Sequence, residues 1–370
     1  MFFFEKKNQK TFGSRSAPLR QRTPLIRKSL LLLFFRKEVL AVFCLLFATA
    51  SAQAAELTDR VLAARQLRCA TVDAALDWNK TDLHGNLSPL EHEICRAVAA
   101  ALFGDASRAD VQSYHSEEEA LNGLHRGFSD IIVGVTPSAN IARVDGVRFG
   151  QPVFIDGQGF MVHKDSGVHG IADMGGRKLC TIDDTDNDPI AMATLAQRGI
   201  RPIPFGFQEE GEMDAAIMDR HCQVASAYLS RLAEVRASFL EAKDFILLPD
   251  IIAVSPVTSA VGAGDSRMAA IVDYTVSALL QAEYMGVTQS SIGRLQAADD
   301  PRLQRLTGDN WSSADGLGLA HDWPKRVIAA VGNYAEIYDR TIGPGTSMNL
   351  PRGMNALWVN GGVMTPLPLQ

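Results

Sequence analysis

Hydrophobic and polar positions alternate with two different periods along the chain. In "SPLEHEICRAVAAALFGD" the apolar residues fall at 90, 94, 97, 98, 101 and 102, close to a 3.6-residue period, which predicts a helix that ends at Gly104. Short apolar runs, residues 67–72 and "SDIIVGVT", predict buried strands. Strands that alternate with helices indicate an α/β fold with a mainly parallel sheet.

A second alternation of the same kind starts after "DGQGFMVHK". The pattern predicts, in chain order, a strand near 158–163, a helix near 168–174, a strand at 178–182, helices at 188–198 and 209–219, and a strand in "CQVASAY". An extended stretch, "FILLPDIIAVSPVTSAV", and a long amphipathic helix follow. Two α/β lobes joined by two extended strands leave a cleft between them, which is the usual place for a ligand.

The first 54 residues predict a signal peptide rather than a part of the fold. Basic residues precede an apolar run at 39–47 and the small residues "ATASAQAAE" follow, so cleavage fits equally well after Ala52 or Ala54. A membrane anchor is the alternative, but the apolar run is shorter than the ~20 residues that a membrane span needs. We therefore expect an exported protein.

Removal of this segment would make the chain strongly acidic. Residues 1–54 hold ten of the 36 Lys and Arg residues and two of the 42 Asp and Glu residues, so 26 basic and 40 acidic residues remain, a formal net charge of −14. Such a surface repels phosphate backbones and anionic lipids. The composition therefore argues against nucleic acid and membrane surfaces as partners.

Four cysteines remain after the predicted cleavage: Cys69, Cys95, Cys180 and Cys222. An even number in an oxidising compartment favours disulfides, and the absence of a C-x-x-C spacing gives little support to a zinc site. Four cysteines allow three pairings. The pairing that keeps each bridge local joins Cys69 to Cys95 and Cys180 to Cys222, and free buried thiols are the alternative.

Several motifs resemble one known family. The segments "CRAVAAALFGD", "DGQGFMVHKD", "SALLQAEYMGVT" and above all "VGNYAEIYDRTIGPGTSMNLPRGMNALWVNGGV" closely resemble the general L-amino-acid-binding proteins of polar amino-acid ABC importers, in solute-binding protein family 3. The resemblance runs from about Leu57 to Leu369, and the four cysteines fall at the family's cysteine positions.

This resemblance implies a type II periplasmic binding protein fold, which closes on its ligand like a hinge. Lobe one would comprise residues 57–154 and 258–370, and lobe two residues 155–257. The crossing strands would bend near 152–157 and 251–257. The expected partners are a small ligand, an amino acid or similar, and an inner-membrane ABC permease. No cofactor is implied, and a monomer is the expected state.

The resemblance also implies ligand-contacting residues in lobe one. An amino-acid site must hold a carboxylate, and the planar guanidinium of arginine gives it two parallel charge-assisted bonds. In "DIIVGVTPSANIAR", Thr136, Ser138 and Arg143 match the family's ligand-contacting positions. Trp78 is the aromatic candidate for a pocket wall, with ordinary core packing as the alternative.

An acidic cluster, "DDTDND" at 183–188, needs a separate interpretation. As an EF-hand it fails, because the sixth position is Pro189 instead of Gly and the twelfth is Leu195 instead of Glu. A simple structural role is N-capping of a helix by Asp186 or Asp188. Relatives carry a Gly-Thr-Thr turn here that grips the ligand carboxylate, whereas this chain has Asp184, Thr185 and Asp186.

A second departure from the family falls at Tyr228. Relatives carry at that position the Asp that pairs with the ligand ammonium. One acid is thus lost and another gained, so we hypothesise that Asp186 binds the ammonium, with Thr185 beside it, while Arg143 keeps the carboxylate. A buried ammonium without an acidic partner would be strongly disfavoured.

Three alternatives differ in the class of function. The ligand could be a small solute that is not an α-amino acid, with Tyr228 bonding or stacking on an uncharged group. The closed form could dock to a receptor as a sensor subunit instead of to a permease. A periplasmic dehydratase-type enzyme on the same fold has less support, because the chain lacks a G-x-S-x-G elbow and "HEICR" lacks the second His of H-E-x-x-H.

Overall fold

The structure is a computed structural model that describes residues 56–72, 85–144, 146–183, 185–295, 299–309 and 314–369. The side chains of Arg143, Val144, Ala314 and Asp315 are outside this description. The predicted signal peptide, Trp78 and Asp184 lie outside the described residues as well. Within the described part of the chain, no helix is long and apolar enough to span a bilayer.

One mixed sheet of nine strands runs through the molecule, in the order β2-β1-β3-β9-β4-β7-β5-β6, with β8 paired to β4. The strands are β1 (Leu67–Val72), β2 (Ala109–Tyr114), β3 (Ile131–Val135), β4 (Val147–His163), β5 (Lys178–Ile182), β6 (Ile203–Phe207), β7 (Val224–Tyr228), β8 (Phe245–Leu247) and β9 (Ala253–Gly262). Strands β1, β2 and β3 are parallel to one another, as are β5, β6 and β7. Strands β4 and β9 are antiparallel to each other and to these neighbours.

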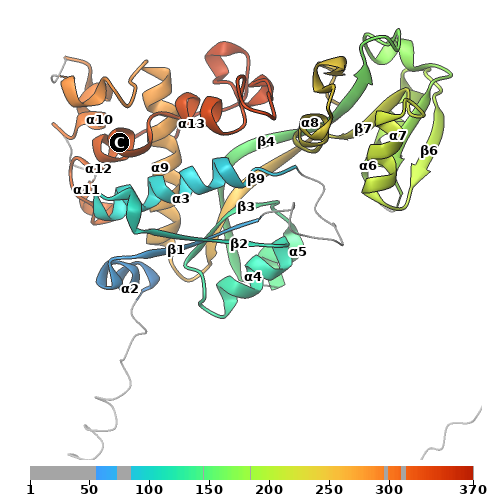
Figure 1. Cartoon of the computed structure of the whole chain (residues 1–370). Helices are drawn as coiled ribbons and strands as arrows, with labels where there is room; N and C mark the ends of the chain where they lie inside the picture. The colour runs from blue at the N-terminus through green and yellow to red at the C-terminus, as the bar shows by residue number, and fades with distance from the viewer. Residues whose placement is uncertain are drawn as a thin grey trace, which may run out of the picture. The chain divides into compact units, whose positions relative to one another are not determined.

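Helices occupy most of the intervening chain (Figure 1). They are α2 (Leu57–Ala64), α3 (Ser88–Phe103), α4 (Glu117–His125), α5 (Ala139–Val144), α6 (Asn187–Gln197), α7 (Glu210–Met218), α8 (Leu229–Ser238), α9 (Ser266–Tyr284), α10 (Pro301–Thr307), α11 (Ala314–Leu317), α12 (Trp323–Val331) and α13 (Tyr334–Thr341). Helix α3 ends, as its pattern predicts, where Gly104 takes a φ of 71°, a left-handed conformation that glycine adopts without strain.

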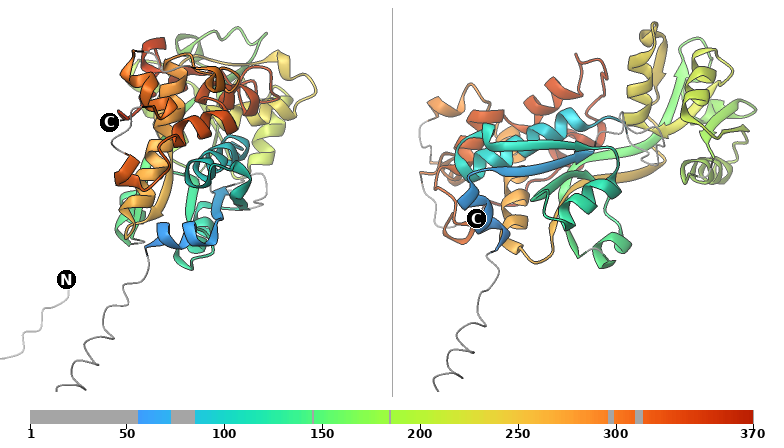
Figure 2. Two further views of the ribbon diagram at one scale, coloured as in Figure 1. Left: turned by 90° about the vertical axis from the view of Figure 1, so that its left-hand side faces the viewer. Right: turned by 60° about the horizontal axis from the view of Figure 1, so that its bottom comes forward.

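Lobe one is built on β1, β2 and β3, and its sheet is covered on both faces. Successive side chains of a strand point to opposite faces. Leu67 and Cys69 accordingly join a core with α3, α9, α12 and α13, whereas Ala70 and Val72 join a second core with α4. Figures 1 and 2 show α3 and α4 on opposite sides of these strands.

Lobe two is built on β5, β6 and β7 and has two smaller cores, one beside α7 and α8 and one beside α6. The long strands β4 and β9 lie between the two sets of parallel strands in the sheet order, with Asp156 opposite Ser255. The prediction of a two-lobed α/β fold with two crossing strands is therefore confirmed.

Both disulfides have the local pairing. Cys69 on β1 is bonded to Cys95 on α3, with a Cα–Cα distance of 6.0 Å. Cys180 on β5 is bonded to Cys222, two residues before β7, with a Cα–Cα distance of 5.7 Å. Each bridge joins elements of one lobe, so neither crosses between the lobes.

Two predicted elements differ from those observed. The helix near 168–174 is only a 3₁₀ turn, Ile171–Met174, because Gly170 before it is fully extended and Gly175 and Gly176 follow directly. The strand near 158–163 is the end of β4, which begins at Val147. Its first half is defined by pairing with β9, a long-range partner that no local periodicity reveals.

Candidate ligand-binding site

The acidic cluster lies where β5 passes into α6. Asp186 occupies the N-cap position of α6 and is exposed, but its side chain makes no capping bond. Asp188 instead accepts a hydrogen bond of 2.7 Å from the Thr181 hydroxyl, which fixes the first turn of the helix to β5. The Thr185 hydroxyl donates to the Ile182 carbonyl at 2.8 Å. The N-cap position that the sequence predicts is therefore correct, while the capping bond itself is absent.

Tyr228 ends β7 beside this cluster and is half-buried. Burial raises the pKa of its phenol above the usual value, a side-chain hydrogen bond with Ser255 lowers it, and the charges of Asp156 and Asp186 raise it further. Strands β5 and β7 are parallel neighbours in the sheet, so Tyr228 and the segment that holds Asp186 follow the C-terminal ends of adjacent strands.

Sequence reasoning missed Asp156 and Ser255, which come to this neighbourhood from the crossing strands. Asp156 is almost fully buried. Its carboxylate accepts a hydrogen bond of 2.8 Å from the Gly157 N–H, one of 3.3 Å from the Ser230 N–H, and one from the Ser230 hydroxyl. The sequence does contain a signal for Asp156, because it is an acid inside the apolar run "VFIDGQGF". A carboxylate is buried in such a run only where hydrogen bonds compensate for its lost hydration.

The lobe-one candidates follow the end of β3. The Thr136 N–H and hydroxyl both donate to one oxygen of Glu117, at the start of α4, at 2.9 Å each. The Ser138 hydroxyl accepts from the Ile141 N–H at 3.5 Å, at the start of α5. Arg143 lies near the end of α5, and its side chain is outside the description. One loop and one short helix thus carry all three candidates.

The described residues of lobe two offer hydrogen-bonding groups near the end of β7. No group of three or more His, Cys, Asp or Glu side chains among the described residues could hold a metal ion. The exposed Asp186 carboxylate, the Tyr228 phenol and the Thr185 hydroxyl can accept hydrogen bonds from a polar ligand, and the phenol can also donate one.

Comparison with known proteins gives relatives over almost the whole described chain. The general L-amino acid-binding periplasmic protein AapJ of Rhizobium johnstonii is 30% identical over 324 residues, which cover 87% of this chain and 95% of the relative. The glutamate/glutamine/aspartate/asparagine-binding protein BztA of Rhodobacter capsulatus is 29% identical over 323 residues, 87% of this chain and 95% of the relative. No protein-family model matches the chain.

Among solved structures, an ABC transporter periplasmic binding protein from Brucella ovis with glutathione bound superimposes with a TM-score of 0.68. It is 29% identical, and the match covers 85% of this chain and 100% of that one. The matches in sequence and in structure extend through both lobes and both crossing strands. The chain therefore belongs to the periplasmic binding proteins of amino-acid ABC transporters, within solute-binding protein family 3.

Proposed function

We propose that this protein is the solute-binding subunit of an ABC importer and that it reversibly binds an amino acid, or a related small zwitterion, between its lobes. The observation that supports this most directly is the position of Asp186 and Tyr228 just after the C-terminal ends of the neighbouring strands β5 and β7, in a chain of this family. An ammonium group placed there would be attracted by the Asp186 carboxylate and could donate hydrogen bonds to it and to the Tyr228 phenol oxygen.

The proposed carboxylate-binding half is in lobe one. Arg143 would form the charge-assisted bonds, and the N–H and hydroxyl groups of Thr136, with the hydroxyl of Ser138, would complete the set of donors. Thr136 already shows the required geometry, because both of its donors bind a carboxylate in the structure, that of Glu117. Trp78 remains the proposed aromatic wall.

The proposed ammonium-binding half is in lobe two. Asp186 would supply the charge, and Tyr228 and Thr185 would supply neutral oxygens beside it. Because the pKa of Tyr228 is raised, its phenol stays neutral throughout the physiological range and can accept or donate a hydrogen bond. The ligand would then contact both lobes only when they are closed, so its binding energy would favour closure.

The relatives indicate the ligand class. AapJ is named for general L-amino acids, BztA for four acidic or amide amino acids, and the Brucella ovis protein contains glutathione. Each of these ligands carries an ammonium and a carboxylate on one carbon, so the class shares one recognition element. We therefore propose an amino acid or a small peptide with a free amino-acid end as the ligand.

The remaining parts of the proposal follow from the family. The protein would act in the periplasm after cleavage of the signal peptide within residues 1–54, as a monomer that delivers its ligand to an inner-membrane permease. It would bind without turnover. Both AapJ and BztA are named as binding proteins, which supports this reading over an enzymatic one.

A thermal-shift screen tests the proposed function. The twenty amino acids, glutathione, simple amines and small organic acids are added in turn to the purified protein, since a ligand that binds the native state alone raises the melting temperature. We expect stabilisation by at least one amino acid or by glutathione, and unchanged ligand after incubation. Stabilisation by organic acids alone would contradict the zwitterion site, and chemical conversion would contradict a binding role.

Replacing Asp186 by alanine is expected to weaken binding of the ligand found in that screen by roughly 10- to 100-fold, because truncating one partner of a close charge pair costs about 2 kcal/mol or more. Isothermal titration calorimetry measures the dissociation constant. The control is Asp219→Ala, an exposed acid at the end of α7. An unchanged dissociation constant for Asp186→Ala would show that the ammonium is bound elsewhere.

Replacing Glu117 by glutamine is expected to strengthen ligand binding several-fold. In the structure the Glu117 carboxylate accepts from both donors of Thr136 that we assign to the ligand carboxylate, so the two carboxylates would compete. Glutamine keeps one acceptor oxygen but removes the negative charge that repels the ligand. The exposed neighbour Glu118 supplies the control, Glu118→Gln. Weaker binding by Glu117→Gln would mean that Glu117 orients Thr136 for the ligand rather than competing with it.

A further inference from the structure

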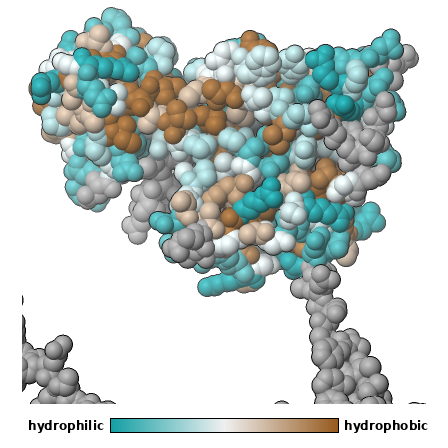
Figure 3. Space-filling view, turned by 180° about the vertical axis from the view of Figure 1, so that it is seen from behind, coloured by the Kyte–Doolittle hydropathy of each residue, from teal (hydrophilic) through white to brown (hydrophobic). Residues whose placement is uncertain are grey.

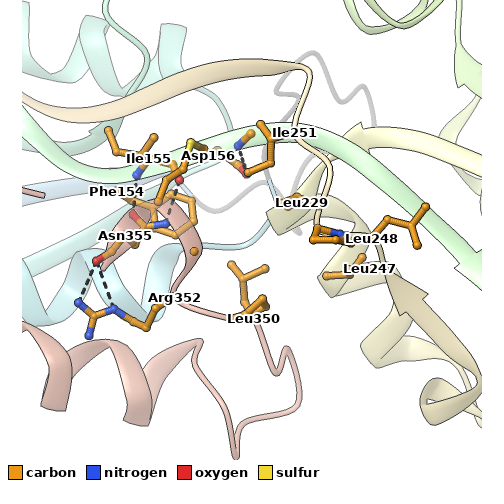
Figure 4. A pocket seen from close by; sticks show the side chains of 15 residues that line it. Phe154, Ile155, Asp156, Leu229, Leu247, Leu248, Ile251, Leu350, Arg352 and Asn355 are labelled. Atoms are coloured by element: carbon orange, nitrogen blue, oxygen red, sulfur yellow. Dashed lines mark hydrogen bonds between the residues drawn. The ribbon is translucent and has the colours of Figure 1, made fainter. Parts of the chain in front are cut away.

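A pocket of about 290 Å³ lies against the middle of β4. Its walls come from three places: β4 itself, the segment from α8 to the start of β9, and the tail that follows α13. The lining residues are Phe154, Ile155, Asp156, Gly157, Leu229, Leu247, Leu248, Pro249, Ile251, Leu350, Pro351, Arg352, Gly353, Met354 and Asn355. Figure 4 shows Leu350 of the tail facing Leu247 and Leu248 across the pocket.

The first part of β4 in this pocket is held by lobe one. The Tyr334 hydroxyl donates to the Val153 carbonyl at 2.7 Å. The Asn355 side chain accepts from the Ile155 N–H at 2.7 Å and donates to the Ile155 carbonyl at 2.9 Å (Figure 4). The side chains of Val153, Phe154 and Ile155 belong to the large core of lobe one, which Ala233 of α8 also joins.

The next residues of the same strand are held by lobe two. The Asp156 carboxylate binds the backbone and hydroxyl of Ser230 at the start of α8. The Gln158 amide donates to the Ser226 hydroxyl on β7 at 3.1 Å. The side-chain bonds to this part of β4 thus come from α13 and the tail as far as Ile155 and from α8 and β7 from Asp156 onward, although α8 also donates to the tail through Arg236. A rotation of the lobes would bend the strand at this point, which lies inside the pocket wall.

The polar groups in the wall already have partners. Arg352 pairs with Glu283 at 2.9 Å, donates to the Asn355 carbonyl at 2.8 Å, and lies over the rings of Tyr334 and Tyr338, 5.2 and 4.9 Å from their centroids. The Asn355 amide is used by Ile155, and the Asp156 carboxylate by Ser230 and Gly157. The rest of the wall is mainly aliphatic. A charged or strongly polar molecule would lose its hydration there without compensation.

Apolar surface continues outward from the pocket. Val254, opposite Gly157 of the pocket wall in the β4–β9 register, is 58% exposed. Figure 3 shows hydrophobic residues gathered in a band on one face of the molecule. Exposed contiguous apolar surface on a soluble protein is often functional.

We propose that this hinge pocket is a second binding site, for a small uncharged apolar molecule of the size of one or two rings, and that its occupation changes the equilibrium between open and closed lobes. Its volume exceeds the roughly 150 Å³ of an apolar cavity that is known to bind benzene. Because its walls are attached to different lobes, the pocket changes shape as the lobes rotate. A molecule that fits one shape better therefore shifts the populations.

Toluene is a suitable probe, and its binding can be followed by NMR of the ¹³C-labelled methionine methyl groups of the full chain. We expect the methyl signal of Met354, which lines the pocket, to shift with one saturable toluene isotherm while that of Met218 on α7 does not move. Benzoate, of similar ring size but charged, is expected to leave Met354 unshifted at the same concentrations. A missing or non-saturable toluene response at Met354 would overturn the site.

The variant Met354→Trp fills the pocket, and Met218→Trp is the control for the same exchange on the exposed surface of α7. Small-angle X-ray scattering without amino acid reports the lobe equilibrium through the radius of gyration. We expect saturating toluene and the Met354→Trp substitution to change the radius of gyration in the same direction. Adding toluene to the Met354→Trp variant should then cause no further change. Toluene binding without any such change would overturn the coupling. None of these measurements depends on the amino-acid site, so failure of the proposed function would leave their interpretation intact.

Discussion

Replacing Arg143 by alanine is expected to weaken amino-acid binding by roughly 100-fold or more. A bidentate pair between a guanidinium and a carboxylate in a closed site combines charge with two hydrogen bonds, and its loss costs about 3 kcal/mol or more. Calorimetric titration of the ligand from the thermal-shift screen gives the dissociation constants. Arg143→Lys is expected to recover only part of the affinity, because an ammonium cannot form the two parallel bonds.

Arg148 provides the matched control for this experiment. It lies five residues further along the chain, on β4, and is exposed. Arg148→Ala is expected to bind the ligand with the wild-type dissociation constant, since an exposed charge that makes no contact with the ligand is largely screened. Equal affinities of Arg143→Ala and wild-type protein would remove Arg143 from the site and leave the ligand carboxylate to the Thr136 and Ser138 loop alone.

Replacing Arg352 by methionine is expected to lower the free energy of unfolding by about 3 kcal/mol at pH 7, because it leaves the Glu283 carboxylate poorly solvated and without its cation. The side chains of Arg352 and Glu283 are only 18% and 11% exposed. Methionine keeps much of the stem that packs on Tyr334 and Tyr338. Urea denaturation monitored by circular dichroism measures the change.

The loss should depend on pH in a defined direction. Burial raises the pKa of Glu283, and Arg352 opposes that rise. In the Arg352→Met variant nothing replaces the lowering effect of the guanidinium, so the pKa of Glu283 in the folded protein is higher still. A carboxyl with a raised folded pKa destabilises the fold when charged, and this penalty disappears as the pH falls through that pKa. The difference between wild-type and variant stabilities should therefore shrink on acidification.

Arg302→Met is the control for this prediction. Arg302 also lies over a tyrosine, Tyr284, and pairs with an acid, Asp300, but its side chain is 52% exposed. Exposed pairs contribute roughly 0–1 kcal/mol, so the change should be small. A comparable loss in both variants would show that the buried position of the Arg352 pair is not what makes it important.

The sequence was sufficient for most of the elements because their signals are local. The 3.6-residue spacing and terminal Gly104 of α3 predicted a helix that the structure contains, and the apolar run at 67–72 is β1. The helix near 168–174 failed for a local reason too, since glycines on both sides leave room for one 3₁₀ turn. The start of β4 at Val147 could not be predicted, because it depends on β9, about a hundred residues away.

Fewer residues of the candidate site than elements of the fold could be predicted from the sequence. Asp186 and Tyr228 are recognisable in the sequence as departures from the family pattern, and they follow the ends of the neighbouring strands β5 and β7. Asp156 and Ser255 are not, because a buried Asp is recognisable only when its partners are known, and Ser230 is 74 residues away. Glu117 lies in the first turn of α4, a common place for an acid, and the sequence gives no sign that it accepts from both donors of Thr136.

The two disulfides bear on how the chain matures. Cys69 and Cys95 are 26 residues apart, and Cys180 and Cys222 are 42 residues apart. If the chain is exported as we propose, the first pair can be oxidised while the second is still being translocated, and a pair formed in this order is already the native one. Export from the N-terminus would therefore favour correct cross-linking without help from a disulfide isomerase, even though β9 and the helices from α9 to α13, which complete lobe one, arrive later.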